Sequence, residues 1–316
     1  MNILEDTKYV IENSDYVKIN HEKIVEFSKK FDPDKADHWL NQAPFNFSHF
    51  SEEDKLHFVI IFNALSFSYW GDPKWTVEYH DKKHDGAWGM ILALGRAIEE
   101  GKDLTNFEYC SKISEEEFSD ILRGNIEIPL FKERYNILKE IGTNMVKNFD
   151  GKASNLINKA DGNALKLLEL IINNFPSFSD ISEYKNKEIH FCKRTQLLVA
   201  DIHQIFNGVS FGKLDNMDKI TACADYKLPL ILNNLGILEY TPELSQKINN
   251  KIEIQKHSSE ETEIRANTIW AVEFIKEEVR KRNPQIMSFQ INDDLWLATQ
   301  GNKIINPYHR TRTTAY

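Results

Sequence analysis

The stretch from Lys55 to Trp70 constrains the fold most, because it is apolar on nearly every side of a helix. Its apolar residues are too many for a single stripe: Leu56, Phe58, Val59, Ile60, Ile61, Phe62, Leu65 and Phe67. A helix that is apolar all round is stable only where other elements surround it. The rest of the chain must therefore supply further helices around this one, and 316 residues are enough for a large core.

Helical spacing of apolar residues recurs through most of the remaining sequence. It predicts helices over residues 7–12, 20–31, 86–100, 114–122, 129–147, 153–173, 191–205 and 260–282, and a shorter helix from Thr241. We expect strands at residues 75–79, with a turn at 81–83, and within residues 286–297, and an extended piece before Phe191. No repeat, low-complexity tract or Pro/Gly linker divides the chain, so the sequence predicts a mostly α protein with a few short strands, in one domain over residues 1–316.

Charge and cysteine content narrow the class of protein. The net charge of −9 argues against a broad nucleic-acid surface, because affinity for a polyanion rests on a basic footprint. Three cysteines without a CxxC motif are typical of a reduced, cytoplasmic protein. The sequence from Met1 to Asp15 lacks the regions of a secretory signal, and no apolar run approaches the ~20 residues that span a bilayer. We therefore expect neither a membrane nor a stable nucleic-acid partner.

Asp225, within the stretch from Asp215 to Leu238, is the best candidate for chemistry from the residues alone. We expect a short helical run through Ala222 and a second helix that begins at Pro229 and ends near Gly236. Asp225 then lies at the joint, where the free N–H groups of the second helix favour an ionised carboxylate. The alternative is an ordinary N-cap aspartate, which spacing alone favours.

Aromatic residues gather around the Gly-Asp-Pro turn after the apolar helix: Phe67, Tyr69, Trp70 and Trp75. They either pack in the core, which is the more common outcome, or form a stacking platform for a planar base.

Lys193 lies opposite the apolar stripe of residues 191–205 but on the same side as Leu197 and Ala200. It is either a snorkelling lysine or a partly desolvated one, which needs an anionic partner or a lowered pKa.

The remaining candidates are charged. Asp85 is expected to cap the helix over residues 86–100, and His80 and His84 suit a metal only weakly, because they straddle a turn instead of sharing a helix face. Glu263 and Arg265 are either surface charges or part of a site. The tail carries three basic residues among tyrosines: His309, Arg310 and Arg312. Basic tails are often disordered, and the alternative for one this aromatic is that it docks and brings cations to an anion.

Six stretches of the chain, in this order, resemble the queuosine salvage family, the queuosine 5′-phosphate N-glycosylases. They are LSFSYW, HDGAWGMILALGRAIEEG, FPSFSDISEYKNKEIHFCKRTQLLVAD, DNMDKITACADYKLPLILNNLGILEY, ETEIRANTIWAVEFI and PYHRTR. The resemblance covers the chain from about residue 57 to the C-terminus. The chain departs from the family pattern at Cys223, at Ala266 and after Trp296.

The resemblance implies a mostly helical fold similar to that of helix-hairpin-helix DNA glycosylases. It also implies hydrolysis of the N-glycosidic bond of queuosine 5′-phosphate, which releases queuine for tRNA modification without a metal or organic cofactor. The family's catalytic aspartate, in its A-D-Y motif, falls on Asp225, where it stabilises or attacks C1′ of the sugar. The family's other motifs place substrate-binding residues at Lys193, Tyr226, Phe67, Ser68, Trp70, His84, Asp85, Trp88, Glu263 and Arg265.

Finer roles are hypotheses from the chemistry of the implied reaction. Phe67, Trp70 and Trp88 would stack on the base, and Asp85 and Glu263 would accept hydrogen bonds from its amino groups. The tail, through Arg310 or Arg312 beside His309, would meet the 5′-phosphate. Two alternatives stay open: a DNA base glycosylase, and a non-catalytic nucleoside-binding protein in which the aspartate is only a helix cap.

Overall fold

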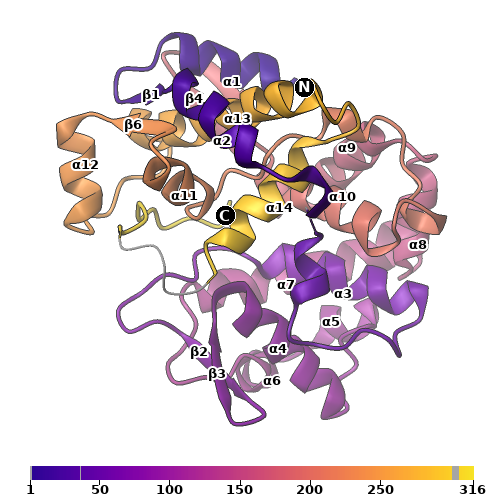
Figure 1. The fold of residues 1–316 in the computed structure, drawn as a ribbon. Helices are drawn as coiled ribbons and strands as arrows, with labels where there is room; N and C mark the ends of the chain where they lie inside the picture. The colour runs from indigo at the N-terminus through magenta and orange to yellow at the C-terminus, as the bar shows by residue number, and fades with distance from the viewer. Residues whose placement is uncertain (1, 36, 301–305) are drawn as a thin grey trace. The chain divides into compact units, whose positions relative to one another are not determined.

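The computed structural model describes residues 2–35, 37–300 and 306–316. These residues form a mostly α-helical protein with three two-stranded antiparallel sheets, which confirms the predicted fold class (Figure 1). Contacts between residues define two compact units. The first unit consists of Met1–Asn41, Asp180–Gln196 and Met217–Tyr316, and the second consists of Gln42–Ser179 and Leu197–Asn216. The likeness to helix-hairpin-helix glycosylases and the single domain over residues 1–316 stay predictions.

The first unit is built around the longest of its helices, α13. Its elements are α1 (Ile3–Glu12), β1 (Val17–Ile19), α2 (His21–Lys30), β4 (Ile181–Tyr184), β5 (Lys187–His190), α11 (Leu228–Asn234), β6 (Leu238–Tyr240), α12 (Pro242–Asn249), α13 (Ser259–Arg280) and α14 (Ser288–Ala298). β1 pairs with β6, with Val17 opposite Tyr240, and β4 forms a hairpin with β5. Helices α1, α2, α11 and α14 all contact α13, so α13 organises this unit.

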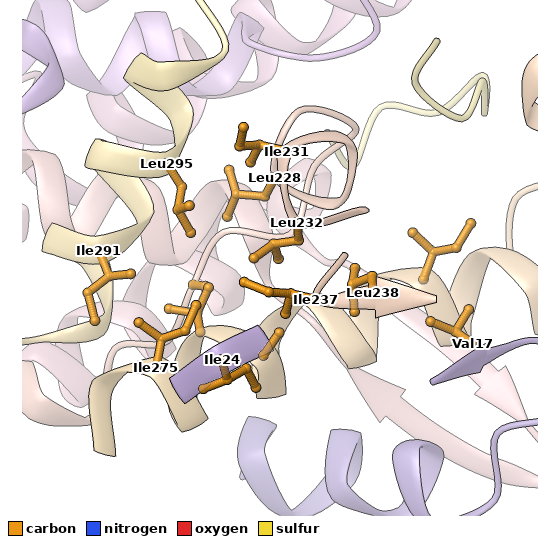
Figure 2. Packing of buried hydrophobic residues seen from close by; sticks show 14 of the residues in the cluster. Val17, Ile24, Leu228, Ile231, Leu232, Ile237, Leu238, Ile275, Ile291 and Leu295 are labelled. Carbon is orange, nitrogen blue, oxygen red and sulfur yellow. The ribbon is translucent and has the colours of Figure 1, made fainter. Parts of the chain in front are cut away.

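Buried aliphatic side chains hold α11 in place (Figure 2). Leu228, Ile231 and Leu232 of α11 belong to one cluster with Leu295 of α14. Full burial of such a side chain stabilises the fold by roughly 1.5–3 kcal/mol. The start of α11, and with it Asp225 just before it, is therefore fixed by packing.

The second unit carries the helix that is apolar on every side. Its elements are α3 (Glu52–Leu65), β2 (Thr76–Tyr79), β3 (Lys82–Asp85), α4 (Gly86–Glu99), α5 (Phe107–Lys112), α6 (Glu115–Ile121), α7 (Phe131–Phe149), α8 (Ala153–Lys159) and α9 (Ala164–Asn174), and α10 (Lys193–Ile205) continues into it from Leu197. Every residue of α3 from Leu56 to Leu65 is buried, as its sequence predicts.

Short 3₁₀ turns occur in both units: η1 (Pro33–Lys35), η2 (Trp39–Gln42), η3 (Pro176–Phe178), η4 (Ser210–Gly212) and η5 (Met217–Lys219). In the described ranges, no helix has the length and apolar content needed to cross a bilayer.

Two predicted boundaries in the second unit are wrong. α3 ends at Leu65 instead of Trp70, and Ser68 has a φ of +38°, which a helix does not allow. The turn between β2 and β3 lies at His80 and Asp81, both at positive φ, so the lysines predicted for the turn belong to β3. Positive φ at two successive residues is the geometry of the tight hairpin turns that match the twist of the strands.

Two predicted elements are also wrong. The helix expected over residues 153–173 is broken into α8 and α9, because Asp161 and Gly162 adopt positive φ. The strand expected within residues 286–297 is the helix α14. Its buried residues recur at helical spacing, which outweighs the strand-like composition of this stretch: Ser288, Phe289, Asn292 and Leu295.

Candidate active site

The segment of residues 220–225 is buried but has no regular secondary structure, so the helical run predicted through Ala222 is limited to the 3₁₀ turn η5 and its extension past Lys219 is wrong. Buried backbone groups outside helices and strands need other hydrogen-bond partners. Two side chains from distant elements provide them. The amide of Thr221 donates to Gln196 Oε1 (2.8 Å), and the amide of Cys223 donates to Asn292 Oδ1 (2.9 Å). The loop before Asp225 is therefore held by α10 and α14.

Asp225 combines a structural contact with a free oxygen. Its Oδ1 accepts hydrogen bonds from the amides of Lys227 (2.7 Å) and Leu228 (2.9 Å), at the start of α11. Its Oδ2 accepts none from the residues that the structure describes, and the side chain is largely buried, with the residue 8% exposed. Asp225 is thus a capping aspartate through one oxygen only. The second oxygen, Oδ2, is available to contact a substrate atom.

Lys193 is the first residue of α10 and is only 6% exposed, as expected for a partly desolvated lysine. Its amide donates to Asp180 Oδ2 (3.0 Å). Within the described ranges, its ammonium group has no carboxylate partner and no hydrogen bond. A buried positive charge without a partner is costly, and it attracts an anionic ligand.

Arg265 is buried and makes several hydrogen bonds to the chain. Its guanidinium donates to both oxygens of Asp180, through Nη1 (2.9 Å) and Nη2 (2.5 Å), and to Glu261 Oε1 (3.4 Å). Its Nε donates to the carbonyl of Ala224 (3.4 Å). Burial acts to lower the pKa of Arg265, but the two carboxylates outweigh it and raise that pKa above its ordinary value. Arg265 therefore contacts the loop of Asp225, and the hydrogen bonds that it makes to the chain use four of its five N–H groups.

Glu263 is also buried, and both of its oxygens are occupied. Oε1 accepts from the amide of Asp15 (3.0 Å) and from the Tyr184 hydroxyl (2.8 Å), and Oε2 accepts from the amides of Tyr16 (2.6 Å) and Val17 (3.2 Å). Burial and the Glu263 carboxylate raise the pKa of Tyr184 above its ordinary range. These contacts tie α13 to the segment that leads into β1, and they leave little capacity to accept from a nucleobase.

The described part of the tail packs against other segments of the first unit, which is the docked one of the two predicted alternatives. The Tyr308 ring lies 4.9 Å from the Tyr226 ring, and the Lys227 ammonium lies 5.6 Å from the centre of the Tyr308 ring. The carbonyl of Arg310 accepts from the amide of Ile254 (2.7 Å). Burial lowers the pKa of Arg312, with Glu253 acting to raise it and Arg310 to lower it further. The Lys227 ammonium therefore lies beside the Tyr226–Tyr308 pair, next to Asp225 in the chain.

His309 differs from its basic neighbours because it is buried and uncharged. Its Nε2 lies 3.3 Å from the Tyr316 hydroxyl, which donates to Glu261 Oε1 (2.9 Å). Burial, with a smaller effect from the Arg265 charge, lowers the pKa of His309 to about 3. At neutral pH the ring is neutral, so it adds no positive charge for a phosphate.

Phe67, Ser68 and Trp70 follow the end of α3 in the second unit, and all three are buried. Arg134 of α7, also buried, donates through Nη2 to the carbonyl of Phe67, and its guanidinium lies 4.0 Å from the centre of the Phe67 ring. The same guanidinium lies 5.2 Å from the centre of the Tyr69 ring. Sequence reasoning missed Arg134, because a buried arginine in a scaffold helix has no local signal.

His84, Asp85 and Trp88 lie where β3 runs into α4. Burial and the charge of Lys82 lower the pKa of the half-buried His84, against a smaller opposite effect of Asp85. Asp85 occupies the N-cap position of α4, but its side chain makes no capping hydrogen bond and pairs with Lys74 (2.8 Å) instead. In the described ranges, no group of three or more His, Cys, Asp or Glu side chains is placed to hold a metal ion.

The predicted site residues fall in both units. Seven lie in the first unit: Lys193, Asp225, Tyr226, Glu263, Arg265, His309 and Arg310. Six lie in the second unit: Phe67, Ser68, Trp70, His84, Asp85 and Trp88. Within the first unit, Arg265 and Asp180 connect the backbone beside Asp225 with the backbone of Lys193. Sequence reasoning missed Asp180, Gln196 and Asn292. Asp180 and Gln196 both lie in the resembling stretch FPSFSDISEYKNKEIHFCKRTQLLVAD, which could have drawn attention to them, whereas Asn292 lies outside all six stretches.

Comparison with known proteins identifies the family to which this chain belongs. The sequence profile of the queuosine salvage protein family matches residues 46–316. Proteins named queuosine 5′-phosphate N-glycosylase/hydrolase are similar over nearly their whole length. The one from Sphaerobacter thermophilus is 35% identical over 322 residues, covering 100% of this chain and 98% of the relative. Those from Mus musculus (33% over 331 residues) and Bos taurus (31% over 339 residues) each cover 99% of this chain and 98% of the relative. The chain therefore belongs to the queuosine salvage protein family.

Proposed function

We propose that this protein hydrolyses the N-glycosidic bond of queuosine 5′-phosphate and releases queuine. Relatives that align with nearly the entire chain carry the name of this activity, and the family profile covers most of the chain. The observation that carries the proposal is the Asp225 carboxylate, which is buried and held through Oδ1 while Oδ2 is left without a partner among the described residues. The reaction as proposed consumes one water, needs no cofactor and takes place in the cytoplasm, without a nucleic-acid partner.

Asp225 has the properties that the bond cleavage demands. Breaking the bond between C1′ and the base builds positive charge on the sugar, and a carboxylate already in place stabilises that charge better than reorganising water does. Two amide donors prevent the carboxylate from rotating, so Oδ2 keeps one direction. This oxygen either stabilises the cation while water attacks C1′ or attacks C1′ itself before hydrolysis. In both routes the water oxygen ends on C1′, and the base leaves with a proton.

Lys193 and the docked tail supply positive charge to the same unit. The Lys193 ammonium is buried without a carboxylate partner in the described ranges, so an anionic group of the substrate would neutralise it. Arg310, with Arg312 and Lys227 near Tyr308, is our candidate for binding the 5′-phosphate, because guanidinium groups match phosphate oxygens in pairs. Tyr226 follows Asp225 in the sequence, and its ring packs against that of Tyr308.

Three residues receive structural roles in this proposal. Glu263, Arg265 and His309 are buried, and their hydrogen bonds go to the chain. We propose that they hold the first unit together instead of contacting the base or the phosphate. The predicted substrate contacts of the second unit stay predictions, to be tested by single substitutions: Phe67, Ser68, Trp70, His84, Asp85 and Trp88.

The test is the release of queuine, followed by chromatography with mass detection. The purified protein is incubated with queuosine 5′-phosphate and, separately, with queuosine. Asp225→Asn keeps an Oδ1 that can accept the two capping hydrogen bonds but removes the charge, whereas Asp225→Ala removes both. Asn163→Ala is the matched control, because Asn163 Oδ1 accepts from the amides two and three residues on, Leu165 (3.0 Å) and Lys166 (3.1 Å).

The three variants separate the cap from the chemistry. We expect Asp225→Ala and Asn163→Ala to lose a similar ~1 kcal/mol of stability. Only the two Asp225 variants should lose turnover, by at least ~100-fold, in line with the loss of a transition-state charge contact. An Asp225→Asn variant with near-full activity would overturn the mechanism. A folded wild-type protein that releases queuine from neither compound would favour a nucleoside-binding role.

A further inference from the structure

Asp180, between η3 and β4, governs how the chain enters α10. Its carbonyl accepts from the amides of Phe191 (2.9 Å) and Cys192 (3.3 Å), and its Oδ2 accepts from the amide of Lys193 (3.0 Å). Three consecutive amides therefore converge on one residue. Cys192 has a φ of +51°, a conformation that non-glycine residues rarely adopt and that neighbouring contacts must hold. The direction in which Lys193 leaves this turn thus depends on Asp180.

The same carboxylate reaches the loop of the catalytic aspartate through Arg265. The Arg265 guanidinium donates to both oxygens of Asp180 (2.9 and 2.5 Å), and its Nε donates to the carbonyl of Ala224 (3.4 Å), next to Asp225. Its position is fixed further by two rings, since its central carbon lies 3.9 Å from the centre of the Phe191 ring and 4.6 Å from that of Tyr316. One planar cation thus joins the two backbone segments that carry the proposed active-site residues.

We infer that Asp180 is a positioning residue of the reaction, which holds Lys193 directly and Asp225 through Arg265. This inference rests on the proposed function. A buried ion pair is weak evidence for a role in stability, because the loss of hydration offsets much of the attraction. In contrast, Asp180 and Arg265 also form hydrogen bonds to the backbone of Lys193 and of Ala224. The proposed reaction depends on the relative position of these two backbone segments. A small displacement of such groups is enough to lower a rate constant strongly.

Asp180→Asn is the direct test, with queuosine 5′-phosphate as substrate. The substitution keeps the shape of the side chain, and Arg265 keeps Glu261 as a charged partner, so we expect a folded protein. We expect kcat to fall by ~10- to 100-fold while KM stays within about twofold of the wild-type value. Glu273→Gln is the matched control. It removes one carboxylate from another buried ion pair of α13, with Lys276, that has no described contact with Lys193 or Asp225.

Arg265→Lys provides a second, independent variant. Lysine keeps the positive charge but cannot donate to both Asp180 oxygens and to Ala224 at once. We expect the same loss of kcat, whereas a role in charge balance alone would leave kcat near the wild-type value. Asp180→Asn and Arg265→Lys proteins that are folded and keep kcat within threefold of wild type would overturn the inference. Failure of the proposed function gives a different result. If that function is wrong, the wild-type protein and the Glu273→Gln variant will not release queuine either.

Discussion

Acidification from pH 7 to pH 5 is expected to destabilise the first unit through His309. The residue is 2% exposed, and burial, with a smaller effect of the Arg265 charge, lowers its pKa to about 3. In the unfolded chain the ring returns to its ordinary pKa of about 6.5. Between these two values the unfolded state binds a proton that the folded state does not bind. The free energy of unfolding therefore falls as the pH falls below about 6.5.

The two pKa values set the size of the effect. The loss is about 1.4 kcal/mol for each pH unit between them, because one pKa unit corresponds to that free energy. From pH 7 to pH 5, His309 should thus lower the free energy of unfolding by about 2 kcal/mol. This is a large part of the ~5–15 kcal/mol by which folded proteins are usually stable.

Urea unfolding at pH 7, 6 and 5 measures this contribution. His309→Gln cannot take up a proton, and its amide can still bond to the Tyr316 hydroxyl, so it should lose about 2 kcal/mol less than the wild-type protein between pH 7 and pH 5. All other groups titrate in both proteins and cancel in the difference. His49→Gln, at an exposed ring, should leave the difference near zero. Equal acid sensitivity of wild-type and His309→Gln proteins would refute the reasoning.

Three further substitutions give separate predictions. Gly142→Ala should lower the free energy of unfolding by about 1–3 kcal/mol in thermal denaturation, because the added Cβ would lie 2.5 Å from the Ser111 amide nitrogen and 2.8 Å from the Phe107 carbonyl oxygen. Glu263→Gln should cost about 1–3 kcal/mol, since one buried acceptor is lost, and should leave KM for queuosine 5′-phosphate unchanged; a raised KM with unchanged stability would instead indicate a contact with the base. Lys193→Met should leave the unfolding free energy equal or higher, because a buried charge is removed, and should lower kcat/KM at least ~10-fold in the queuine assay; unchanged kinetics would contradict the proposed role.

Sequence reasoning succeeds here where the determining interactions are local. The burial of α3 follows from its own apolar residues, and the cap at Asp225 follows from the start of α11 three residues on. Lys193 was singled out by the spacing of the helix to which it belongs. In these cases, the partners lie within a few residues of each other, so spacing carries the information.

The other parts of the candidate site depend on contacts between distant residues. Glu263 bonds to an amide 247 residues away, and Arg265 pairs with Asp180 at a separation of 85 residues. Asn292 reaches the loop before Asp225 across 69 residues. No periodicity in a single sequence reports such pairs, because they arise only when whole elements pack. The roles of Glu263 and Arg265 in holding the chain were therefore outside the reach of sequence patterns.

The division of the chain into two interleaved units has a consequence for biosynthesis. Every segment of the second unit has been translated once Asn216 is added, whereas the first unit needs residues at both ends of the sequence. Domains generally fold as units as the chain emerges from the ribosome. The second unit can therefore fold early, whereas α1, α2 and β1 can pack only after α13 and β6 have been translated. The first unit, which carries the proposed catalytic Asp225, is then completed last, so the proposed activity is expected only once its last segment, Met217–Tyr316, has been translated.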